Sequence, residues 1–390
     1  MEALDIHPRE LILLSVIGLF FIIQVIYYLC IYIRIYLQNR AVRKGKATFT
    51  EELPPLSVVI CARNESHNLR EFLPSILEQD YPNFEVIVIN DGSADESEDL
   101  LSFLEEKYPH LYHSFTPDSS RYISHKKLAL TLGVKASKHD WLVFTEANCF
   151  PESKNWLRLI ARNLTPGTEI VLGYSGYERG KGWFNKRTSF DTLFASMRYL
   201  GFAIARRPYM GIGRNMAYRK ELFFREKGFS AHLSLQRGDD DLFINQIATR
   251  KNTRVETNPD ATIRMKPLKY HKEWKEEKVS YVATSKRFKG SQRFLLGFET
   301  MSRLFFYAAV ITTLALSILD KNWIVTGIAA LIWVLRYILQ AVIINKTAKE
   351  LGEKRRYYFS LPLFDLYQPW QSFIFKAYRR IRGKGDFMRR

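Results

Sequence analysis

The chain has 390 residues, enough for a complete α/β domain and a smaller additional part. Lysine and arginine outnumber aspartate and glutamate by 58 to 40, and the resulting net charge of +18 favours phosphates, nucleic acid or an anionic membrane surface as partners. The cysteines Cys30, Cys61 and Cys149 are spread apart, which excludes a disulfide framework and a cysteine-based zinc site and fits a reducing compartment.

An apolar run without any charge extends over residues 11–33 and is long enough to span a bilayer. A cleaved signal peptide would start with basic residues and have a shorter apolar core, whereas here the basic cluster follows the run. The positive-inside rule therefore puts the N-terminus outside and the chain from residue 34 onward in the cytoplasm. The basic cluster consists of Arg34, Arg40, Arg43, Lys44 and Lys46.

Residues 56–92 predict a βαβ unit of a parallel sheet. The apolar runs 56–61 and 84–89 have the length of buried strands, and the segment between them has apolar residues at helical spacing. Polar segments follow both strands, at residues 62–66 and 90–93. Since ligands of such sheets bind beyond the carboxyl ends of the strands, we expect these two segments to line a nucleotide pocket.

Further polar segments accompany the elements predicted downstream. They are a helix at 96–108, a helix start at 124–133 that carries Lys126, a strand at 141–145 that runs into Glu146-Ala147-Asn148, a glycine-containing strand at 211–219, and a helix that opens with Asp239-Asp240-Asp241. Acidic residues stabilise a helix N-terminus, so capping is the ordinary role for Asp239 and Asp241.

Taken in order, these segments resemble the motifs of the family 2 inverting glycosyltransferases, whose catalytic domain has the GT-A fold. The resemblance covers roughly residues 54–290 and is specific because it is a series. The matching stretches read VVICARNES, VIVINDGSAD, SHKKLALTLG, EANC, GIGRNMAYR, QRGDDDLF and TSKRF. The last stands in place of the Gln-x-x-Arg-Trp box of membrane glycosyltransferases, with threonine and phenylalanine instead of glutamine and tryptophan.

The resemblance implies that most of these segments bind a nucleotide-sugar donor. Asp91 takes the place of an aspartate that contacts the nucleoside, although Asn-Asp-Gly-Ser is also ordinary turn chemistry. Lys126 would attract phosphate at a helix N-terminus, where a solvated surface lysine is the alternative, and Arg287 would clamp the diphosphate. The implied donor-binding residues are Ala62, Arg63, Asn64, Glu65, Asp91, Lys126, Glu146, Ala147, Asn148, Asn215, Asp239 and Arg287.

A divalent cation, Mg²⁺ or Mn²⁺, is implied at the position of the family's Asp-x-Asp motif. There, two hard oxygen ligands hold the metal while the donor phosphates fill other coordination sites, and the metal neutralises the leaving nucleoside diphosphate. In this chain Glu146 and Asn148 occupy the two positions. Because asparagine supplies an oxygen without a charge, metal affinity is expected to be lower and metal dependence stays open.

The resemblance assigns the catalytic base to Asp240, the second acid of the Asp-Asp pair. Transfer with inversion needs a base opposite the leaving group, which takes the proton of the acceptor hydroxyl as that hydroxyl attacks. The reacting carbon is oxocarbenium-like, as in glycoside hydrolysis. A neighbouring carboxylate raises the pKa of Asp240, which would help it act as a base.

Two more apolar stretches, 304–319 and 323–345, are separated by a short turn and predict a transmembrane hairpin. Arg336 lies inside the second stretch, where it either faces the polar head of an acceptor or snorkels or pairs within the bundle. Phe288 is implied to stack on the acceptor, with anchoring at the membrane interface as the alternative. The aromatic tail 357–378 is interrupted by prolines and has basic flanks, which favours an interfacial or re-entrant segment.

The predicted fold class is α/β, with a GT-A catalytic domain between N-terminal and C-terminal transmembrane helices. The expected parts are an anchor and basic linker at 1–48, the GT-A domain at 49–265, an interfacial amphipathic segment at 266–300, the hairpin at 301–345 and an interfacial or re-entrant tail at 346–390.

The expected function is inverting transfer from a nucleotide-sugar, mostly a UDP-sugar in the resembling family, to a lipid or lipid-linked saccharide. The expected place is the cytoplasmic face of a membrane, a bacterial inner membrane rather than an endomembrane, and the layout is similar to that of ceramide glucosyltransferases. The alternatives are a processive polysaccharide synthase, for which three spans are few, and a donor-binding membrane protein without turnover, favoured by the altered Glu146-Ala147-Asn148. A nucleic-acid partner is excluded because the basic residues cluster beside membrane segments, which points to an anionic membrane surface.

Overall fold

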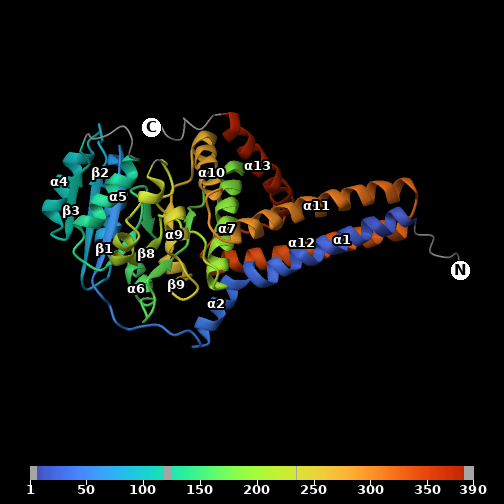
Figure 1. Ribbon diagram of the computed structural model, residues 1–390, viewed down its shortest axis with the longest axis horizontal. Coiled ribbons are helices and arrows are strands. Elements are labelled where there is room, and N and C mark those ends of the chain that lie inside the picture. Colours follow the sequence, from blue (N-terminus) through green and yellow to red (C-terminus); the bar gives the residue numbers. More distant parts are fainter. Residues whose placement is uncertain (1–6, 118–123, 234, 382–390) are drawn as a thin grey trace.

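The structure is a computed structural model that describes residues 7–117, 124–233 and 235–381. It consists of a globular α/β part and a long rod of helices that projects from one side of it (Figure 1). Helix α1 (Pro8–Tyr27) begins at the far end of the rod. Helices α10 (His271–Ser285) and α13 (Leu361–Ile381) lie where the rod meets the globular part (Figure 1).

A seven-stranded sheet forms the centre of the globular part, in the order β3-β2-β1-β4-β8-β6-β9. β1 pairs in parallel with β2 and β4, and β2 with β3, whereas β8 runs antiparallel to both of its neighbours. The strands are β1 (Leu56–Ala62), β2 (Phe84–Asn90), β3 (Leu111–Phe115), β4 (Trp141–Phe144), β6 (Ile170–Leu172), β8 (Met216–Arg219) and β9 (Thr253–Val255). The predicted α/β class with a mostly parallel sheet is confirmed, and the carboxyl ends of β1, β2 and β4 meet at one edge.

Helices cover both faces of the sheet because alternate residues of a buried strand point to opposite sides. Val58 and Ile60 belong to the apolar core under α3 and α4, while Val59 belongs to the core under α5 and α7. Asp91 and the turn after β4 emerge between these two layers. The helices are α3 (Ser66–Leu77), α4 (Ser97–Lys107), α5 (His125–Ala136), α6 (Trp156–Ala161), α7 (Gly182–Ile204), α8 (Lys220–Arg225) and α9 (Asp241–Ile247).

A second, three-stranded sheet begins directly after Glu146-Ala147-Asn148. Its order is β5-β10-β7, with β5 (Cys149–Pro151) antiparallel to β10 (Ile263–Met265) and β7 (Ser175–Tyr177) parallel to it. Cys149 is fully buried in this sheet, so the turn that carries Glu146 is anchored by β4 on one side and β5 on the other. Short 3₁₀ turns at Ser230–His232 and Pro259–Ala261 complete the described part of the domain.

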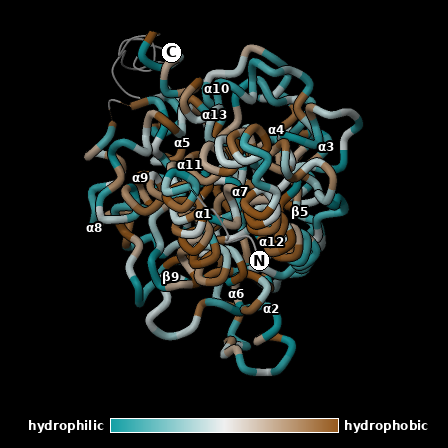
Figure 2. Tube along the Cα trace, turned by 90° about the vertical axis from the view of Figure 1, so that its right-hand side faces the viewer, coloured by the Kyte–Doolittle hydropathy of each residue, from teal (hydrophilic) through white to brown (hydrophobic). Residues whose placement is uncertain are grey.

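Three helices of the rod are long and apolar enough to cross a membrane. They are the continuous helical segment Pro8–Arg43, α11 (Gln292–Leu319) and α12 (Trp323–Glu350). α1 packs against both α11 and α12, and Figure 2, which looks along the rod from its free end, shows the three helices together and largely hydrophobic. The membrane helices expected at both ends of the domain are therefore present.

A continuous helical segment links the rod to the globular part. A π-helical turn, Tyr28–Tyr32, joins α1 to α2 (Arg34–Arg43), so the helix extends beyond the predicted span 11–33. Tyr28 and Tyr32 are buried against α7, where Gly201 approaches the backbone of Ile31. A β-carbon at residue 201 would lie 2.5 Å from the carbonyl oxygen of Ile31, so only glycine fits this crossing.

The C-terminal tail forms one helix, α13, which packs against α10 and α11. Pro362, which we had taken as a break, lies in its first turn, where proline is tolerated because the backbone N–H has no helical partner. Its outward side is apolar and aromatic, as expected of a helix that lies in a membrane interface. The exposed residues of this side are Leu363, Leu366, Tyr367, Trp370, Phe373, Ile374 and Ile381.

Candidate functional site

The first site residue, Asp91, follows β2 and is almost completely buried. Its Oδ1 accepts a hydrogen bond of 2.9 Å from Thr116 Oγ1 and lies 3.4 Å from Nδ1 of His125. The exposed guanidinium of Arg63 approaches its other oxygen to 4.0 Å from the end of β1. The two polar segments after β1 and β2 are therefore brought together, as the βαβ pattern predicts.

Lys126, in the first turn of α5, bridges two carboxylates from distant parts of the chain. Its Nζ donates to Glu146 Oε1 at 2.9 Å and lies 3.1 Å from Asp239 Oδ2. Burial lowers the pKa of Lys126, but the two carboxylates outweigh this effect and hold the pKa above its ordinary value. Lys126 is therefore a permanent cation that joins the end of β4 to the start of α9.

Arg214 holds the second oxygen of Glu146. Its Nε donates to Glu146 Oε2 at 2.8 Å, and its Nη1 donates to Glu277 Oε1 on α10 at 3.1 Å. Burial opposes ionisation of Glu146, but Lys126 and Arg214 keep the pKa of its carboxyl group well below the ordinary value. Both oxygens of Glu146 are thus engaged by cations.

Asp240 is the N-cap of the short helix α9. Gly238 precedes the acidic residues with φ = +102°, a conformation that glycine adopts without strain, and the turn brings Asp240 beside residue 213. The carboxylate accepts hydrogen bonds from the backbone N–H groups of Gly213 at 3.0 Å and Asp241 at 2.7 Å, and from Tyr281 Oη at 3.3 Å. Its Oδ1 and Oδ2 are held in one orientation by groups from three segments.

The charge state of Asp240 depends on its neighbours. Burial and the adjacent carboxylate of Asp239 raise the pKa of Asp240 above the ordinary value, against the opposing effect of Lys126. Asp239 behaves differently: burial favours its neutral form, but Lys126 and Arg237 hold its pKa below the ordinary value. Asp239 is therefore kept ionised, while the carboxylate of Asp240 is made a stronger base.

The predicted site residues near the ends of β1, β2, β4 and the start of α9 converge. Cys61, near the end of β1, lies among them: burial raises its pKa to about 12, Lys126 opposes the rise, and Asp91, Asp239 and Glu146 add to it. The contacts of His125 with Asp91 and of its neighbour Lys126 with Glu146 and Asp239 bring the three carboxylates to the same edge of the sheet. Ala147 is buried in the same turn as Glu146, and Asn148 is exposed at its tip.

Several other predicted residues lie outside this cluster or serve the fold. Asn64, with φ = +54°, and Glu65 form the loop after β1 through hydrogen bonds to Ala94 and Asn68. Asn215 is buried and uses its amide on Tyr174 O at 2.7 Å, Ala261 O at 2.9 Å and the Trp156 indole at 3.0 Å. Arg287 is exposed at the end of α10.

The oxygen donors at the Glu146-Ala147-Asn148 turn do not fit a divalent metal. Lys126 and Arg214 engage both oxygens of Glu146, and Asn148 Oδ1 accepts from the Cys149 thiol at 3.3 Å. Across the described ranges, no three His, Cys, Asp or Glu side chains gather as they would around a metal ion. The turn lacks the uncommitted carboxylates that Mg²⁺ or Mn²⁺ requires.

A cavity of about 260 Å³ lies beside the Asp240 cluster. Arg214, Glu277 and Tyr281 belong to its lining and also to the cluster, while Thr300 and Arg303 line it from α11. The cavity therefore extends from Tyr281, which donates to Asp240, to Thr300 and Arg303 on α11. Aromatic side chains dominate much of its wall: Phe194, Tyr199, Tyr209, Tyr281, Phe288 and Phe375.

Phe288, for which an acceptor contact was predicted, is buried in this wall. Its ring packs edge-on against Tyr209 at a centroid distance of 5.8 Å. Three buried donor atoms of the wall, Arg198 Nε, Arg303 Nε and Gln371 Nε2, have no hydrogen-bond partner among the described residues. These three N–H groups could therefore donate hydrogen bonds to a ligand in the cavity.

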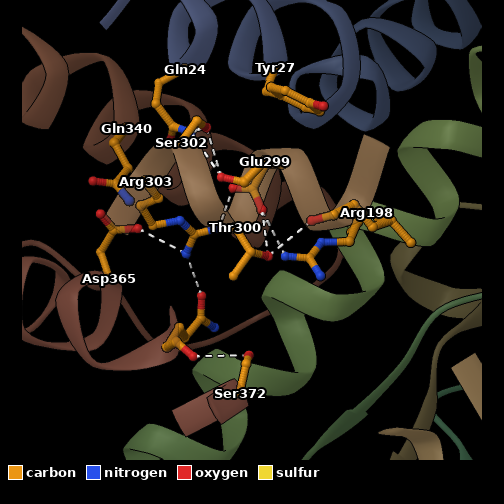
Figure 3. A network of polar contacts seen from close by, with 12 residues as sticks. Gln24, Tyr27, Arg198, Glu299, Thr300, Ser302, Arg303, Gln340, Asp365 and Ser372 are labelled. Atoms are coloured by element: carbon orange, nitrogen blue, oxygen red, sulfur yellow. Dashed lines mark hydrogen bonds and ion pairs between the residues drawn. The ribbon is translucent and has the colours of Figure 1, made fainter. Parts of the chain in front are cut away.

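A buried network of charged groups lies behind the cavity, at the foot of the rod (Figure 3). Arg303 of α11 lies between Glu299 and Asp365, with 3.2 Å to Asp365, while Arg198 of α7 donates to Glu299 at 3.0 Å. Asp365, on α13, also pairs with Arg336 of α12 at 2.8 Å. The network joins α7, α11, α12 and α13 across the junction.

The charge of Arg336 is therefore paired with a carboxylate inside the helix bundle. Its Nη2 donates to Gln24 Oε1 at 3.2 Å and to Asp365, and its Nη1 donates to the hydroxyl of Tyr307 at 3.1 Å. Of the two predicted roles, head-group contact and pairing inside the bundle, the structure therefore shows the second. Arg336 is absent from the cavity lining among the described residues.

Sequence reasoning missed four residues of the cluster, His125, Arg214, Glu277 and Tyr281, although all lie in or near segments it had singled out. Arg214 directly precedes Asn215 in the glycine-containing motif, and His125 precedes Lys126. Glu277 and Tyr281 are four residues apart on α10, a spacing that puts both on one helix face. That spacing was the available signal.

Comparison with known proteins gives a family match and a fold match. Residues 57–225 match the profile described as Glycosyl transferase family 2. An uncharacterized glycosyltransferase of Rickettsia prowazekii is 41% identical over 128 residues, which are 32% of this chain and 37% of that protein. The poly-beta-1,6-N-acetyl-D-glucosamine synthase of Staphylococcus aureus is 26% identical over 98 residues, 25% of this chain and 23% of that protein. The chain thus matches well under half of the length of these curated relatives.

A solved structure with the same fold is a mannosyltransferase from Pyrobaculum calidifontis in complex with GDP-Man and Mn²⁺. It superimposes with a TM-score of 0.56 at 20% identity, covering 89% of this chain and 99% of that chain. This likeness shows the GT-A fold of the globular part.

Proposed function

We propose that this chain, whose residues 57–225 match the model of glycosyl transferase family 2, transfers a sugar, with inversion, from a nucleotide-sugar to an acceptor that enters from the membrane. The observation that carries this proposal is the position of Asp240, which follows Asp239 of the polar strand-end cluster and accepts a hydrogen bond from Tyr281 in the wall of the cavity. A donor and an acceptor can approach this carboxylate from opposite sides.

The donor is assigned to the strand-end side. Asp91 would accept hydrogen bonds from the nucleoside, as its position after β2 suggests, and Arg63 borders it. Lys126 would face the diphosphate at the start of α5, where the helix dipole also attracts negative charge. The nucleotide-sugar class is supported by the family. A UDP-sugar remains the proposed donor, and GDP-mannose, which the Pyrobaculum enzyme binds, is the second candidate.

The reaction is a single displacement at the anomeric carbon. The acceptor hydroxyl oxygen attacks that carbon while its proton passes to Asp240. The bond from the carbon to the diphosphate oxygen breaks on the opposite face, and the electron pair leaves with the nucleoside diphosphate. Because the pKa of Asp240 is raised, its carboxylate is a stronger base than an ordinary aspartate. Tyr281 and Gly213 orient the carboxylate for this transfer.

The acceptor is assigned to the cavity. Its aromatic wall suits the face of a sugar ring or the first part of a lipid chain. Its spare donors on Arg198, Arg303 and Gln371 suit an acceptor rich in oxygen atoms. Because the cavity extends to the foot of α11, an amphiphile could reach Asp240 while its tail stays in the bilayer. A lipid or a lipid-linked saccharide is therefore the proposed acceptor class, on the cytoplasmic face of the membrane.

The test uses the full chain in liposomes made from a bacterial lipid extract, with a panel of radiolabelled nucleotide-sugars. We expect label in the lipid-extractable fraction with one donor. Asp240→Asn should lower this transfer by about 100-fold or more, the typical share of a general base, while donor binding is retained. Asp260→Asn, the same change at an exposed position, is the matched control. Equal transfer by Asp240→Asn and the unmodified protein would reject the role of Asp240.

A processive polysaccharide synthase is the second candidate, because a segment of the chain is similar to the Staphylococcus aureus synthase. The same assay separates the two functions by product length. A ladder of long, water-soluble chains would favour the synthase, whereas lipid carrying one added sugar favours the primary proposal. Donor binding without any labelled product would instead favour a protein without turnover.

A further inference from the structure

We propose that the ammonium of Lys126 takes the place of a divalent metal between Glu146 and Asp239, so that side chains alone bind the donor diphosphate and balance its charge. The inference rests on the proposed function, because it concerns the donor of that reaction. It departs from the metal expected at an Asp-x-Asp position, and it starts from the failure of Glu146 and Asn148 to provide a metal site.

The geometry around Lys126 resembles a bridging cation. Its Nζ lies 2.9 Å from Glu146 Oε1 and 3.1 Å from Asp239 Oδ2, two carboxylates that are far apart in the sequence. An ammonium group has three N–H donors, and these two contacts use two of them. Within residues 7–117, 124–233 and 235–381 no other contact uses the third, which would donate to an oxygen of a diphosphate. A metal ion in this position would likewise bridge the carboxylates and offer its remaining coordination to phosphate.

The second oxygen of Glu146 is also committed. Arg214 Nε donates to it at 2.8 Å, and Glu277 fixes the same guanidinium from α10 at 3.1 Å. Arg214 is largely buried, so it cannot move into solvent and leave the carboxylate free. A metal would have to displace both Lys126 and Arg214 to gain a bidentate ligand. Asn148 could offer such a metal only an uncharged oxygen.

The charges of the cluster support the same conclusion. Lys126, Arg214 and Arg237 are the cations around Glu146 and Asp239, and Glu277 is the partner of Arg214. With Asp240, which acts as a base when ionised, these three cations face four carboxylates. The side chains alone therefore offset most of the negative charge that a metal would otherwise balance. Arg237 is exposed and can turn its guanidinium toward an incoming phosphate.

The test measures binding of UDP and GDP to the full chain in detergent by calorimetry, in excess EDTA and again with Mn²⁺. We expect the better of the two nucleotides to bind equally well, within about twofold, under both conditions. Electron paramagnetic resonance without nucleotide should show that the protein leaves added Mn²⁺ free in solution. A variant with Lys126→Ala, Arg214→Ala, Glu146→Asp and Asn148→Asp should instead bind Mn²⁺, because it provides two carboxylates and removes both cations that engage residue 146.

Lys126→Met should weaken binding of the diphosphate roughly tenfold or more, the effect of a lost charge-assisted hydrogen bond, without changing binding of the free nucleoside. Lys135→Met, on the exposed side of the same helix, is the matched control and should change neither. Unchanged diphosphate affinity in Lys126→Met would overturn the inference.

The two proposals fail in different ways. Nucleotide binding that requires Mn²⁺, with Mn²⁺ bound stoichiometrically to the unmodified protein, would overturn the role of Lys126 and leave the proposed function standing. Unmodified protein that binds neither UDP nor GDP under either condition would overturn both.

Discussion

Three consecutive aspartates at the start of α9 have three different surroundings. Asp239 faces Lys126, Asp240 faces the backbone of Gly213 and the hydroxyl of Tyr281, and Asp241 accepts from the hydroxyl of Thr284. Their pKa values differ accordingly. Lys126 and Arg237 lower the pKa of Asp239, whereas burial and neighbouring negative charge raise the pKa values of Asp240 and Asp241. Separation of this kind allows one carboxylate to remain a fixed anion while its neighbour exchanges a proton.

The pH dependence of transfer should report this coupling. Asp240 acts as a base only when ionised, so activity should fall as the pH drops through its raised pKa. Asp239→Asn removes the neighbouring negative charge and frees Lys126 to favour ionised Asp240. Both effects lower the pKa of Asp240 and should move the acidic limb of kcat/KM to lower pH. A limb that stays in place, or moves to higher pH, would contradict the assignment, and Asp260→Asn should leave it unchanged.

At the level of single residues, much of the cluster could be predicted from the sequence. Asp91, Lys126, Glu146, Asp239 and Asp240 were all expected near one edge of the sheet, and the structure brings them together. The sequence could not show how the charged side chains pair with one another. The contact of Arg214 with Glu146 depends on how β8 lies antiparallel beside β4, and the contact with Glu277 depends on the docking of α10. Neither the pairing of β8 with β4 nor the docking of α10 produces a periodic pattern in the sequence.

Among the elements, long apolar patterns were predictable and short strands were not. β1, β2 and β4 are continuous apolar runs buried on both faces, which is why they could be read directly. β5, β6, β7, β9 and β10 each have three residues, too few to show alternation. The tail was read as interrupted because it contains prolines, yet tertiary contacts of Asp365 and Phe375 hold it as the helix α13.

The stability of the junction should depend on Asp365, which is shared by Arg303 and Arg336. Asp365→Asn leaves the buried guanidinium of Arg336 without its anion and takes one of the two anions from Arg303, a loss of about 3–5 kcal/mol for a broken buried pair. Thermal unfolding in detergent, followed by tryptophan fluorescence, should show a clear fall in Tm.

The exposed pair of Arg9 and Asp320 at the far end of the rod is the control. Asp320→Asn should cost only about 0–1 kcal/mol, because solvent screens an exposed pair. Equal Tm values for Asp365→Asn and Asp320→Asn would show that the buried network does not hold the junction together.

For the molecule as a whole, the direction of the rod predicts the membrane topology. α1 begins at the end of the rod that also carries the turn between α11 and α12, and the globular part lies at the other end (Figure 1). With the basic cluster that follows α1 on the cytoplasmic side, the globular part is expected in the cytoplasm and this turn outside.

Cysteine labelling can test this topology. In a chain with Cys30→Ala, Lys321→Cys should react with an impermeant maleimide in intact cells, because residue 321 lies in the exposed turn between α11 and α12. Lys181→Cys, exposed on the globular part, should react only after the membrane is permeabilised. The opposite pattern would place the catalytic part outside and contradict the proposed use of a cytoplasmic nucleotide-sugar.

The helical neck that passes from α1 through the π-helical turn into α2 has a further consequence. Because Tyr28 and Tyr32 pack against α7 and Gly201 lies close to the backbone of Ile31, the position of Asp240 relative to the rod is fixed by the protein itself. The protein would therefore select acceptors by how far their reactive hydroxyl projects from the membrane. It would favour amphiphiles whose reactive hydroxyl projects to that one level and leave shorter or longer head groups unmodified, so its selectivity would depend on reach as well as on chemistry.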